Sequence, residues 1–284
     1  MKVESPTFRL HGIVGNKQKG GLKPESMETF TPQILRFDSL PSTNLEAARR
    51  AIEGAAEGLC VVAAEQTAGR GRLQREWVSP KSAGLYFSII LRPGFEQNGW
   101  PLLTLMAAIA VHDALLDSCA LKTDIKWPND ILINEKKLCG ILAETVETPH
   151  GRAVVVGIGI NLTSSSFPAD LYRVASSVES ATGKSPDAEV ILGALVHALL
   201  MQYQLLQHDR GPEVIVGEWC ARSSYCEGKR VRVIESNRTL EGTTRGLQSD
   251  GALRVETDDG DIRIIRAGDV SVVRPCEIIS QNGS

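Results

Sequence analysis

The chain has 284 residues, of which 42% are hydrophobic and 23% charged, and its formal net charge is −3. This length suits one sizeable domain plus a small one, and the composition is typical of a globular protein. A general nucleic-acid-binding protein is usually more basic, so any anion site on this chain must be local. The densest candidate is "GRGRLQR" at 69–75, although most arginine clusters are solvated loops.

The first predicted elements follow an unpatterned N-terminal segment. Residues 1–30 lack sustained periodicity. We expect a loose extension there, too short and too poorly patterned for a helix-turn-helix domain. "ILRF" at 34–37 predicts a short strand. A helix is predicted next, because Thr43 followed by Glu46 has the spacing of a capping box and apolar residues then recur at helical spacing.

The middle of the chain predicts buried strands around one long buried helix at 100–119. The segment at 124–146 predicts a strand, a break at Pro128 and a hairpin that turns around residues 134–136. Three further apolar runs have the length of buried strands: "LCVVAA" at 59–64, "GLYFSIIL" at 84–91 and "AVVVGIGINL" at 153–162. Residues 66–82 are expected to form a loop.

The pattern of apolar residues changes near the end of the chain. Helical patterns dominate from 188 to 220, and short alternating strands with Gly or Asp turns follow from 228. The chain is therefore predicted to be α+β, with a mixed β-sheet and helices at 31–227 and a small β-barrel at 228–278.

Cysteine usage and hydropathy indicate the compartment. The six cysteines and five histidines lack metal-binding spacing, so no structural zinc site is expected. Cys60, Cys119 and Cys139 lie in apolar runs and are expected to be buried. Six unpatterned thiols suit a reducing compartment. No stretch is expected to span a membrane, and no hydrophobic signal segment precedes the first strand, so we predict a cytoplasmic protein.

Polar residues gather where apolar strands end, which is where sites tend to be built. Taken singly, each group has a simpler explanation: a helix cap, a solvated loop, a surface turn, or a core strand in which glycine permits close packing. Four such groups occur: Ser42–Asn44, Gln66–Trp77, Lys126–Asp130 with Lys137, and Gly157–Asn161. Their order in one chain is a stronger signal than any one of them.

Together these groups resemble the bacterial biotin–protein ligases (biotin–acetyl-CoA-carboxylase ligases) over roughly residues 33–275. The matching sequences are "STN" at 42–44, "EQTAGRGR" at 65–72, "KWPND" at 126–130, "KLCGIL" at 137–142 and "GIGIN" at 157–161. The resemblance implies a class II aminoacyl-tRNA synthetase-like catalytic domain and an SH3-like C-terminal module. It also implies that ATP activates biotin to biotinyl-5'-AMP, with Mg²⁺ on the phosphates, and that a lysine of biotin carboxyl carrier protein then takes the biotin.

The resemblance assigns the arginine loop to the adenylate. Glycines allow a loop to fold over a ligand, and arginines hold phosphate and carboxylate oxygens with forked donors. Gly69, Arg70 and Arg72 are expected to contact biotin, and Arg72 to retain the intermediate. Arg75 is expected on the ATP side. Trp77 either covers the purine or packs the closed loop.

The remaining roles are also carried over from the family. Lys137 is expected to bridge the biotin carboxylate and the α-phosphate as the main catalytic group, and Lys126 to lie on the ATP side. Asn129 and Asp130 serve the phosphates, Mg²⁺ or the acceptor amine, without individual assignment. The other expected contacts are Ser42, Thr43, Asn44 and Gln66 with biotin, Gly140 and Gly157 as backbone against biotin, and Asn161 near the adenine.

Two rival functions are open at this stage. A lipoate or octanoate ligase on a related scaffold keeps the lysine but lacks the "GRGR" and "KWPND" pairing. A nucleic-acid-binding module built on "GRGRLQR" and the small barrel is disfavoured by the acidic net charge. We also predict no sequence-specific DNA binding and no membrane partner, and either a monomer or a homodimer.

Overall fold

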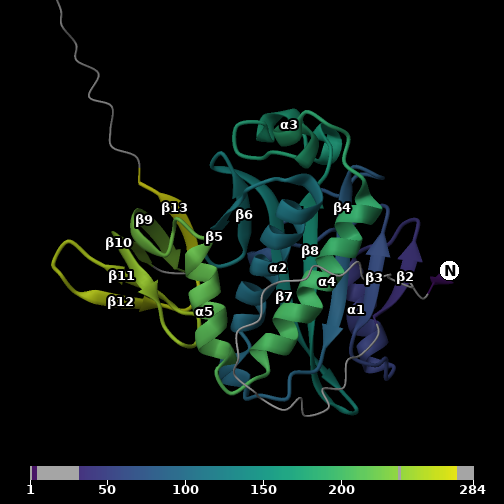
Figure 1. The fold of residues 1–284 in the computed structure, drawn as a ribbon, viewed down its shortest axis with the longest axis horizontal. Coiled ribbons are helices and arrows are strands. Elements are labelled where there is room, and N and C mark those ends of the chain that lie inside the picture. The colour runs from purple at the N-terminus through teal and green to yellow at the C-terminus, as the bar shows by residue number, and fades with distance from the viewer. Residues whose placement is uncertain (1, 5–31, 236–237, 274–284) are drawn as a thin grey trace, which may run out of the picture.

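A computed structural model of the chain describes residues 2–4, 32–235 and 238–273. It contains an eight-stranded mixed sheet and a five-stranded antiparallel sheet (Figure 1). The predicted α+β class, with a mixed sheet followed by an all-β module, is confirmed at this level. The strands of the larger sheet, in spatial order, are β1 (Lys2–Glu4), β2 (Gln33–Phe37), β3 (Leu59–Ala63), β4 (Gly84–Leu91), β8 (Gly151–Asn161), β7 (Lys136–Thr148), β6 (Asp130–Ile133) and β5 (Asp124–Lys126). Only β2 and β3 are parallel neighbours among these described strands.

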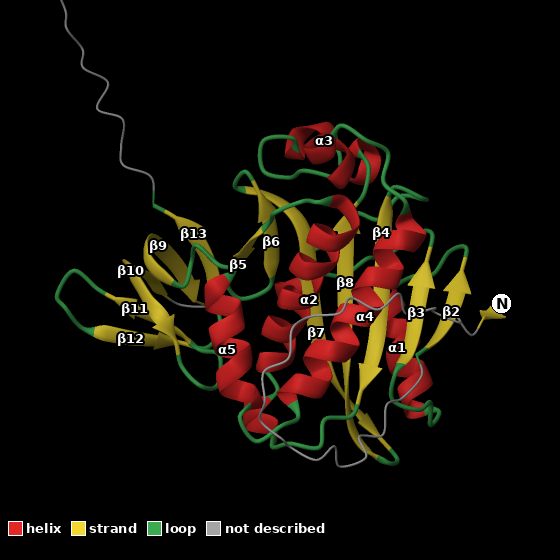
Figure 2. Cartoon of the chain, in the orientation of Figure 1, coloured by secondary structure: helices red, strands yellow, loops and turns green. Residues whose placement is uncertain are grey.

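Helices cover both faces of the larger sheet (Figure 2). α2 (Leu102–Cys119) and α4 (Ala188–Leu206) pack on one face, and α1 (Thr43–Ile52) packs on the other. Successive side chains of a strand point to opposite faces. Phe87 of β4 accordingly joins the α2 side of the core, whereas Ile90 joins the α1 side.

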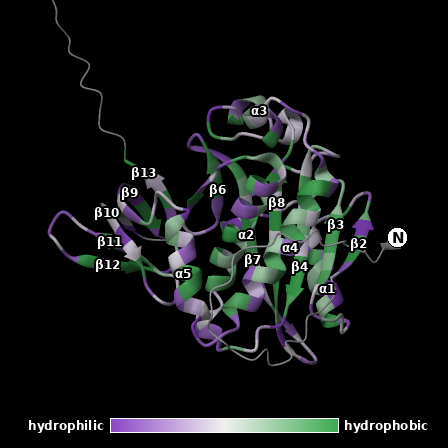
Figure 3. Cartoon of the chain, in the orientation of Figure 1, coloured by the Kyte–Doolittle hydropathy of each residue, from purple (hydrophilic) through white to green (hydrophobic). Residues whose placement is uncertain are grey.

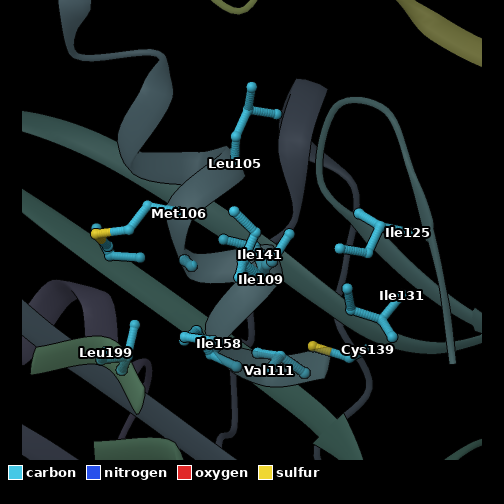
Figure 4. Close-up of a cluster of buried hydrophobic side chains, with 14 of the residues drawn as sticks. Leu105, Met106, Ile109, Val111, Ile125, Ile131, Cys139, Ile141, Ile158 and Leu199 are labelled. Atoms are coloured by element: carbon cyan, nitrogen blue, oxygen red, sulfur yellow. The ribbon is translucent and has the colours of Figure 1, made fainter. Parts of the chain in front are cut away.

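The main core lies between α2 and the sheet. Ile109 of α2 packs among residues of β7 and β8 that include Ile141 and Ile158 (Figure 4). The same core continues into the C-terminal module, where Val231 and Leu253 are fully buried in it. The two sheets are therefore joined by shared apolar packing.

The C-terminal module is the five-stranded sheet. Its strands, in spatial order, are β12 (Ile262–Ile265), β11 (Leu253–Glu256), β10 (Arg238–Leu247), β9 (Glu227–Glu235) and β13 (Asp269–Val272). Helix α5 (Gly211–Ala221) precedes it and packs against β10. The alternating pattern predicted from residue 228 onward is confirmed as strands as far as Val272, and residues 274–278 of the predicted module lie outside the described residues.

Two expectations about secondary structure were incomplete. Lys2–Glu4 pair antiparallel with β2, so the expected loose N-terminal extension is wrong for these three residues. Residues 5–31 lie outside the described residues. Between β8 and α4 the sequence predicted no element, but the structure has the short helix α3 (Val178–Thr182), capped by the Ser177 hydroxyl, which accepts from the Ser180 amide.

The predicted capping box of α1 is wrong. The N-cap residue is Ser42, and its side chain makes no capping hydrogen bond. The Thr43 amide and hydroxyl both donate to Gln66 Oε1, at 2.8 and 3.1 Å. Glu46 forms ion pairs one turn along the helix, with Arg49 at 2.6 Å. A distant side chain therefore satisfies the helix N-terminus, and spacing along the sequence could not indicate it.

We expected no segment long and apolar enough to span a membrane, and this expectation is wrong for two helices. Both α2 and α4 pass that test. Their apolar residues are used inside the protein, however, because Met106 of α2 and Leu195 and Leu199 of α4 all belong to the main core. Figure 3 shows the hydrophobic residues concentrated in β4 and along these helices. Core packing accounts for their hydropathy.

The cysteines depart in part from their predicted environment. Cys60 and Cys139 are fully buried, as predicted, whereas Cys119 is only half-buried. Cys220 and Cys226 form a disulfide between the end of α5 and the start of β9. The description of the six cysteines as unpatterned thiols is thus wrong for this pair, and it no longer supports a reducing compartment.

A buried histidine in α2 should make the stability depend on pH. His112 is 6% exposed and lies 2.9 Å from Thr123 Oγ1. Burial lowers its pKa below 6.5, so the unfolded chain takes up a proton that the folded chain resists as the pH falls below 6.5. Stability should then decline by up to about 1.4 kcal/mol per pH unit on acidification. Urea unfolding at several pH values between 5 and 7 should show this slope, and His112→Gln should reduce it; an unchanged slope would contradict the assignment.

Candidate active site

A cavity lies on the α1 side of the larger sheet, where three adjacent strands carry small residues. Ser88 of β4 and Leu142 of β7 flank Gly157 of β8, and in the next row Gly140 lies beside Gly159. These glycines line a cavity of about 720 Å³. This volume is within the range of small-molecule sites.

One end of the cavity is a buried network of uncharged hydrogen-bonding groups. Ser88 Oγ lies 2.8 Å from Thr43 Oγ1 and 2.7 Å from Asn44 Oδ1. Gln66 accepts from Thr43 and donates to Ser79 Oγ at 2.9 Å. Ser42, Thr43, Asn44 and Gln66, all predicted site residues, thus line the same end of the cavity. Such groups can donate to and accept from a polar but uncharged ring.

Gly157 is required by the close approach of Asn44. A Cβ at this position would lie well inside van der Waals contact of Asn44 Oδ1. We therefore expect Gly157→Ala to push Asn44 out of its network, to lower stability by about 1–3 kcal/mol and to weaken ligand binding. Thermal unfolding and ligand titration measure the two effects.

Gly217 in α5 supplies the control for this substitution. A Cβ there meets no heavy atom within 4 Å, and helix interiors favour alanine over glycine. Gly217→Ala should leave ligand binding unchanged and stability equal or higher. Equal behaviour of the two variants would show that Asn44 does not depend on Gly157.

A cluster of two lysines and one carboxylate lies farther along the cavity. Asp130 Oδ1 is 2.6 Å from Lys137 Nζ, and its Oδ2 is 3.0 Å from Lys126 Nζ. The Asp130 side chain is only 14% exposed. Burial raises the pKa of its carboxyl, but the two ammonium groups outweigh burial and hold the pKa below its usual value. The cluster carries a net positive charge that faces the cavity.

Trp77 fills the space above the glycines. Its indole ring is in contact range of Gly140 and Gly159, either of which would clash with it if a Cβ were added. Lys137 Nζ lies 5.4 Å from the ring centroid. The buried indole N–H of Trp77 has no hydrogen-bond partner among the described residues. Trp77 therefore packs the loop against the sheet, and stacking on a purine stays a prediction.

The three arginines of the loop at 69–77 have different surroundings. Arg72 is half-buried and donates to Asn129 Oδ1 at 3.1 Å and to the Gly268 carbonyl at 3.3 Å. Arg70 pairs with Glu144 of β7 at 2.8 Å. Arg75 pairs with Asp269 in the C-terminal module. All three line the cavity, but Arg72 is the most enclosed.

Two asparagines fix the backbone around the cavity. Asn129 Nδ2 donates to the Ile141 carbonyl at 2.8 Å, so its amide joins β7 to Arg72. Asn161 Nδ2 donates to the Ser176 carbonyl at 3.0 Å and thereby holds the segment before α3 beside β7. Gly69 lies away from the ligand space, packed under the Trp77 carbonyl and Ser79. The other predicted residues meet in one cavity.

Three residues that hold the side chains around the cavity were not identified from the sequence. Ser88 is the lone serine in the apolar run of β4, and this isolation could have indicated a role. Glu144 holds both Arg70 and Asn44 Nδ2, the latter at 2.9 Å, but a single acidic residue within a strand gives no signal in the sequence. Asp269 belongs to a module that reads in sequence as an ordinary β surface.

Two segments of the chain match models of known protein families. Residues 35–161 match the biotin/lipoate A/B protein ligase family, and residues 228–273 match the biotin protein ligase C-terminal domain. A bifunctional ligase/repressor of Bacillus subtilis is 37% identical over 256 residues, covering 89% of this chain and 77% of that protein. A biotin–[acetyl-CoA-carboxylase] ligase of Paracoccus denitrificans is 36% identical over 219 residues, covering 75% and 89%.

A solved structure agrees with these matches. The biotin protein ligase of Aquifex aeolicus in complex with biotin and ATP superposes with a TM-score of 0.75 at 28% identity, covering 87% of this chain and all of that one. These matches define an ATP-dependent protein ligase. The chain belongs to the biotin–protein ligase family, which confirms the predicted resemblance over the lipoate or octanoate alternative.

Proposed function

We propose that this chain joins biotin to a lysine of biotin carboxyl carrier protein in two steps. In the first step the biotin carboxylate attacks the α-phosphorus of ATP, forming biotinyl-5'-AMP and releasing pyrophosphate. In the second step the lysine amine attacks the acyl carbon and AMP leaves. The observation that carries the proposal is one cavity with an uncharged hydrogen-bonding end and a cationic end about Lys137.

The uncharged end suits the ring system of biotin. A buried ureido group needs both donors and acceptors, and Thr43, Asn44 and Gln66, which line the cavity, supply them. Ser88 holds Thr43 and Asn44 in place. We assign the aliphatic tail to the part of the cavity that Gly140 and Gly157 line, between this end and the lysines. Ser42, at the N-cap of α1, lines the same end.

The cationic end suits the reaction of two anions. A carboxylate and a triphosphate repel each other, and fixed positive charge between them lowers the barrier. Lys137 and Lys126 provide this charge, and Asp130 holds both ammonium groups in place. We assign Lys137 to the biotin carboxylate and α-phosphate, and Lys126 to the ATP side.

The arginine loop is proposed as the cover of the intermediate. The Arg72 side chain points from the loop to Asn129. In this position its guanidinium can contact the phosphate and help to exclude water from the mixed anhydride. Arg70 and Arg75 extend the positive surface on either side. Trp77 and Asn161 border the remaining space, which we assign to the adenosine.

Mg²⁺ is proposed to enter with ATP. The described residues hold no group of three His, Cys, Asp or Glu side chains that could bind a metal ion. Asp130 is engaged by two lysines and the side-chain amide oxygen of Asn129 by Arg72, so these two residues do not fit a resident metal site. Mg²⁺ on the phosphates would neutralise their charge.

Several finer assignments are also proposals. We assign a class II aminoacyl-tRNA synthetase-like catalytic domain to 31–227 and an SH3-like module to 228–278; the mixed sheet and the antiparallel sheet support them. A cytoplasmic location and the absence of sequence-specific DNA binding remain predictions, as does the choice between monomer and homodimer. A footprint of the protein on operator DNA would contradict the prediction that it does not bind DNA sequence-specifically.

Ligand-dependent thermal shifts test the proposal. Biotin with MgATP should raise the unfolding midpoint, because a ligand that binds only the folded state stabilises it by mass action. Lipoate with MgATP should raise the midpoint no further than MgATP alone, and an oligonucleotide should leave it unchanged. A larger shift with lipoate than with biotin would contradict the proposed substrate.

A further inference from the structure

The tip of the arginine loop is a tight turn with an unfavourable backbone. Leu73 and Gln74 both have positive φ angles, 54° and 58°. Non-glycine residues rarely adopt this conformation, and for a bulky residue it is costly. The Leu73 side chain is 68% exposed, so apolar packing does not offset the cost. Two backbone hydrogen bonds close the turn: the Gly71 amide donates to the Arg75 carbonyl at 2.7 Å, and the Arg75 amide donates to the Arg72 carbonyl at 3.1 Å. The side chains of Arg72 and Arg75 add contacts outside the loop.

The two residues that flank the tip both contact one corner of the C-terminal module. Arg72 donates to the Gly268 carbonyl through Nη1 and Nη2, each at 3.3 Å. Arg75 forms an ion pair with the neighbouring residue, Asp269. The corner is therefore contacted on both sides of Leu73–Gln74. We call Gly268–Asp269 the latch corner.

The latch corner is built as a fixed point. Gly268 has a φ of 155°, and a Cβ there would lie 3.0 Å from the Ile234 carbonyl oxygen, so this turn requires glycine. Asp269 starts β13 and pairs with Ile234 of β9. The Trp127 indole N–H donates to the Gly251 carbonyl at 3.0 Å and ties the module to the catalytic domain. The loop thus closes against a support that does not belong to its own domain.

The negative charge of Asp269 in the latch corner also stabilises the charged form of Arg72. Burial lowers the pKa of Arg72, and the carboxylate of Asp269 is the first of two acidic groups that oppose this effect. Arg75 itself is 67% exposed and Asp269 30%, so water and salt screen their ion pair. The pair is suited to reversible closure, since a loop that covers an intermediate must also open to the acceptor.

We propose that Asp269 is a positioning residue for the arginine loop: by holding Arg75 it keeps the tip closed, and it thereby sets how long biotinyl-5'-AMP is retained. The inference rests on the proposed function. It assigns the C-terminal module a part in retention of the intermediate, distinct from formation of the adenylate at Lys137.

The test separates formation from retention. Pyrophosphate release in the first turnover reports formation, and escape of labelled biotinyl-5'-AMP into excess unlabelled adenylate reports retention. Asp269→Asn keeps the shape of the side chain and removes its charge. We expect formation within about twofold of the unsubstituted protein and escape about two- to fivefold faster, the range of an exposed ion pair. Asp269→Glu should restore slow escape.

Two further arms show whether the effect passes through Arg75. Arg75→Gln should speed escape as Asp269→Asn does, and the double variant should be no faster than either single variant. Added salt should speed escape from the unsubstituted protein more than from Asp269→Asn. Asp258→Asn removes a carboxylate that pairs with Arg230 at 2.6 Å in the same module, and it should change neither rate.

The outcomes are distinct. No pyrophosphate release from the unsubstituted protein would overturn the proposed function itself. Normal formation with unchanged escape from Asp269→Asn would overturn the latch alone. Fully additive effects of the Arg75 and Asp269 substitutions would also overturn it, because Asp269 would then act without Arg75.

Discussion

Lys137→Ala should abolish adenylate formation while leaving the fold intact. Lys137 Nζ is held 2.6 Å from Asp130 in the cationic end of the cavity, where two anions must meet. Loss of one fixed electrostatic contact to a transition state costs about 10²–10³ in rate. We therefore expect biotin-dependent pyrophosphate release to fall by at least this factor. Stability should change little, because the side chain is 37% exposed and Asp130 keeps Lys126.

The neighbouring lysine is the matched control. Lys136 donates to the Tyr172 carbonyl at 2.8 Å and does not line the cavity, so Lys136→Ala should release pyrophosphate normally. A normal rate in Lys137→Ala would refute the catalytic assignment. Equal losses in both variants would point to the segment they share rather than to the Lys137 ammonium.

Arg72→Gly should turn a selective enzyme into one that leaks its intermediate. Arg72 is enclosed between Asn129 and Gly268, and it is the loop arginine best placed to hold a phosphate. A hydrogen bond to a charged group contributes about 1.5–3 kcal/mol, so escape of biotinyl-5'-AMP should become about 10- to 100-fold faster. Released adenylate acylates exposed amines. Bystander proteins in the same tube should become biotinylated.

Two variants separate the guanidinium from loop flexibility. Leu73→Gly adds the same flexibility to the loop without removing charge, and its side chain is exposed, so labelling of bystanders should stay low. Arg72→Gln removes the charge without adding glycine, and it should leak as Arg72→Gly does. Strong labelling by Leu73→Gly, or none by Arg72→Gly, would contradict the proposed role.

Local patterns predicted most of the fold because they depend on neighbouring residues. The apolar run of β4 and the hairpin at 134–136 were read correctly, since strand periodicity and turn residues act over a few positions. The capping box failed for the converse reason. The Thr43 hydroxyl had a better partner, Gln66, that lies 23 positions away.

The site was predicted by motif and completed by contacts of long range. Lys137 and Asp130 stand out in their motifs, and the structure brings them together across the β6–β7 hairpin. Asp269 lies 194 positions from Arg75, in a module whose charged residues resemble any solvated β surface. No spacing rule reaches that far. The same holds for Glu144, whose importance rests on holding Arg70 and Asn44 at once.

The most direct test of the central claim is the mass of a carrier domain after incubation with the protein, biotin and MgATP. The predicted result is a gain of one biotinyl group on a lysine of the carrier domain, which is absent without ATP and absent when lipoate replaces biotin. A gain with lipoate but none with biotin would contradict the account, as would no gain with either acid in a sample that binds MgATP.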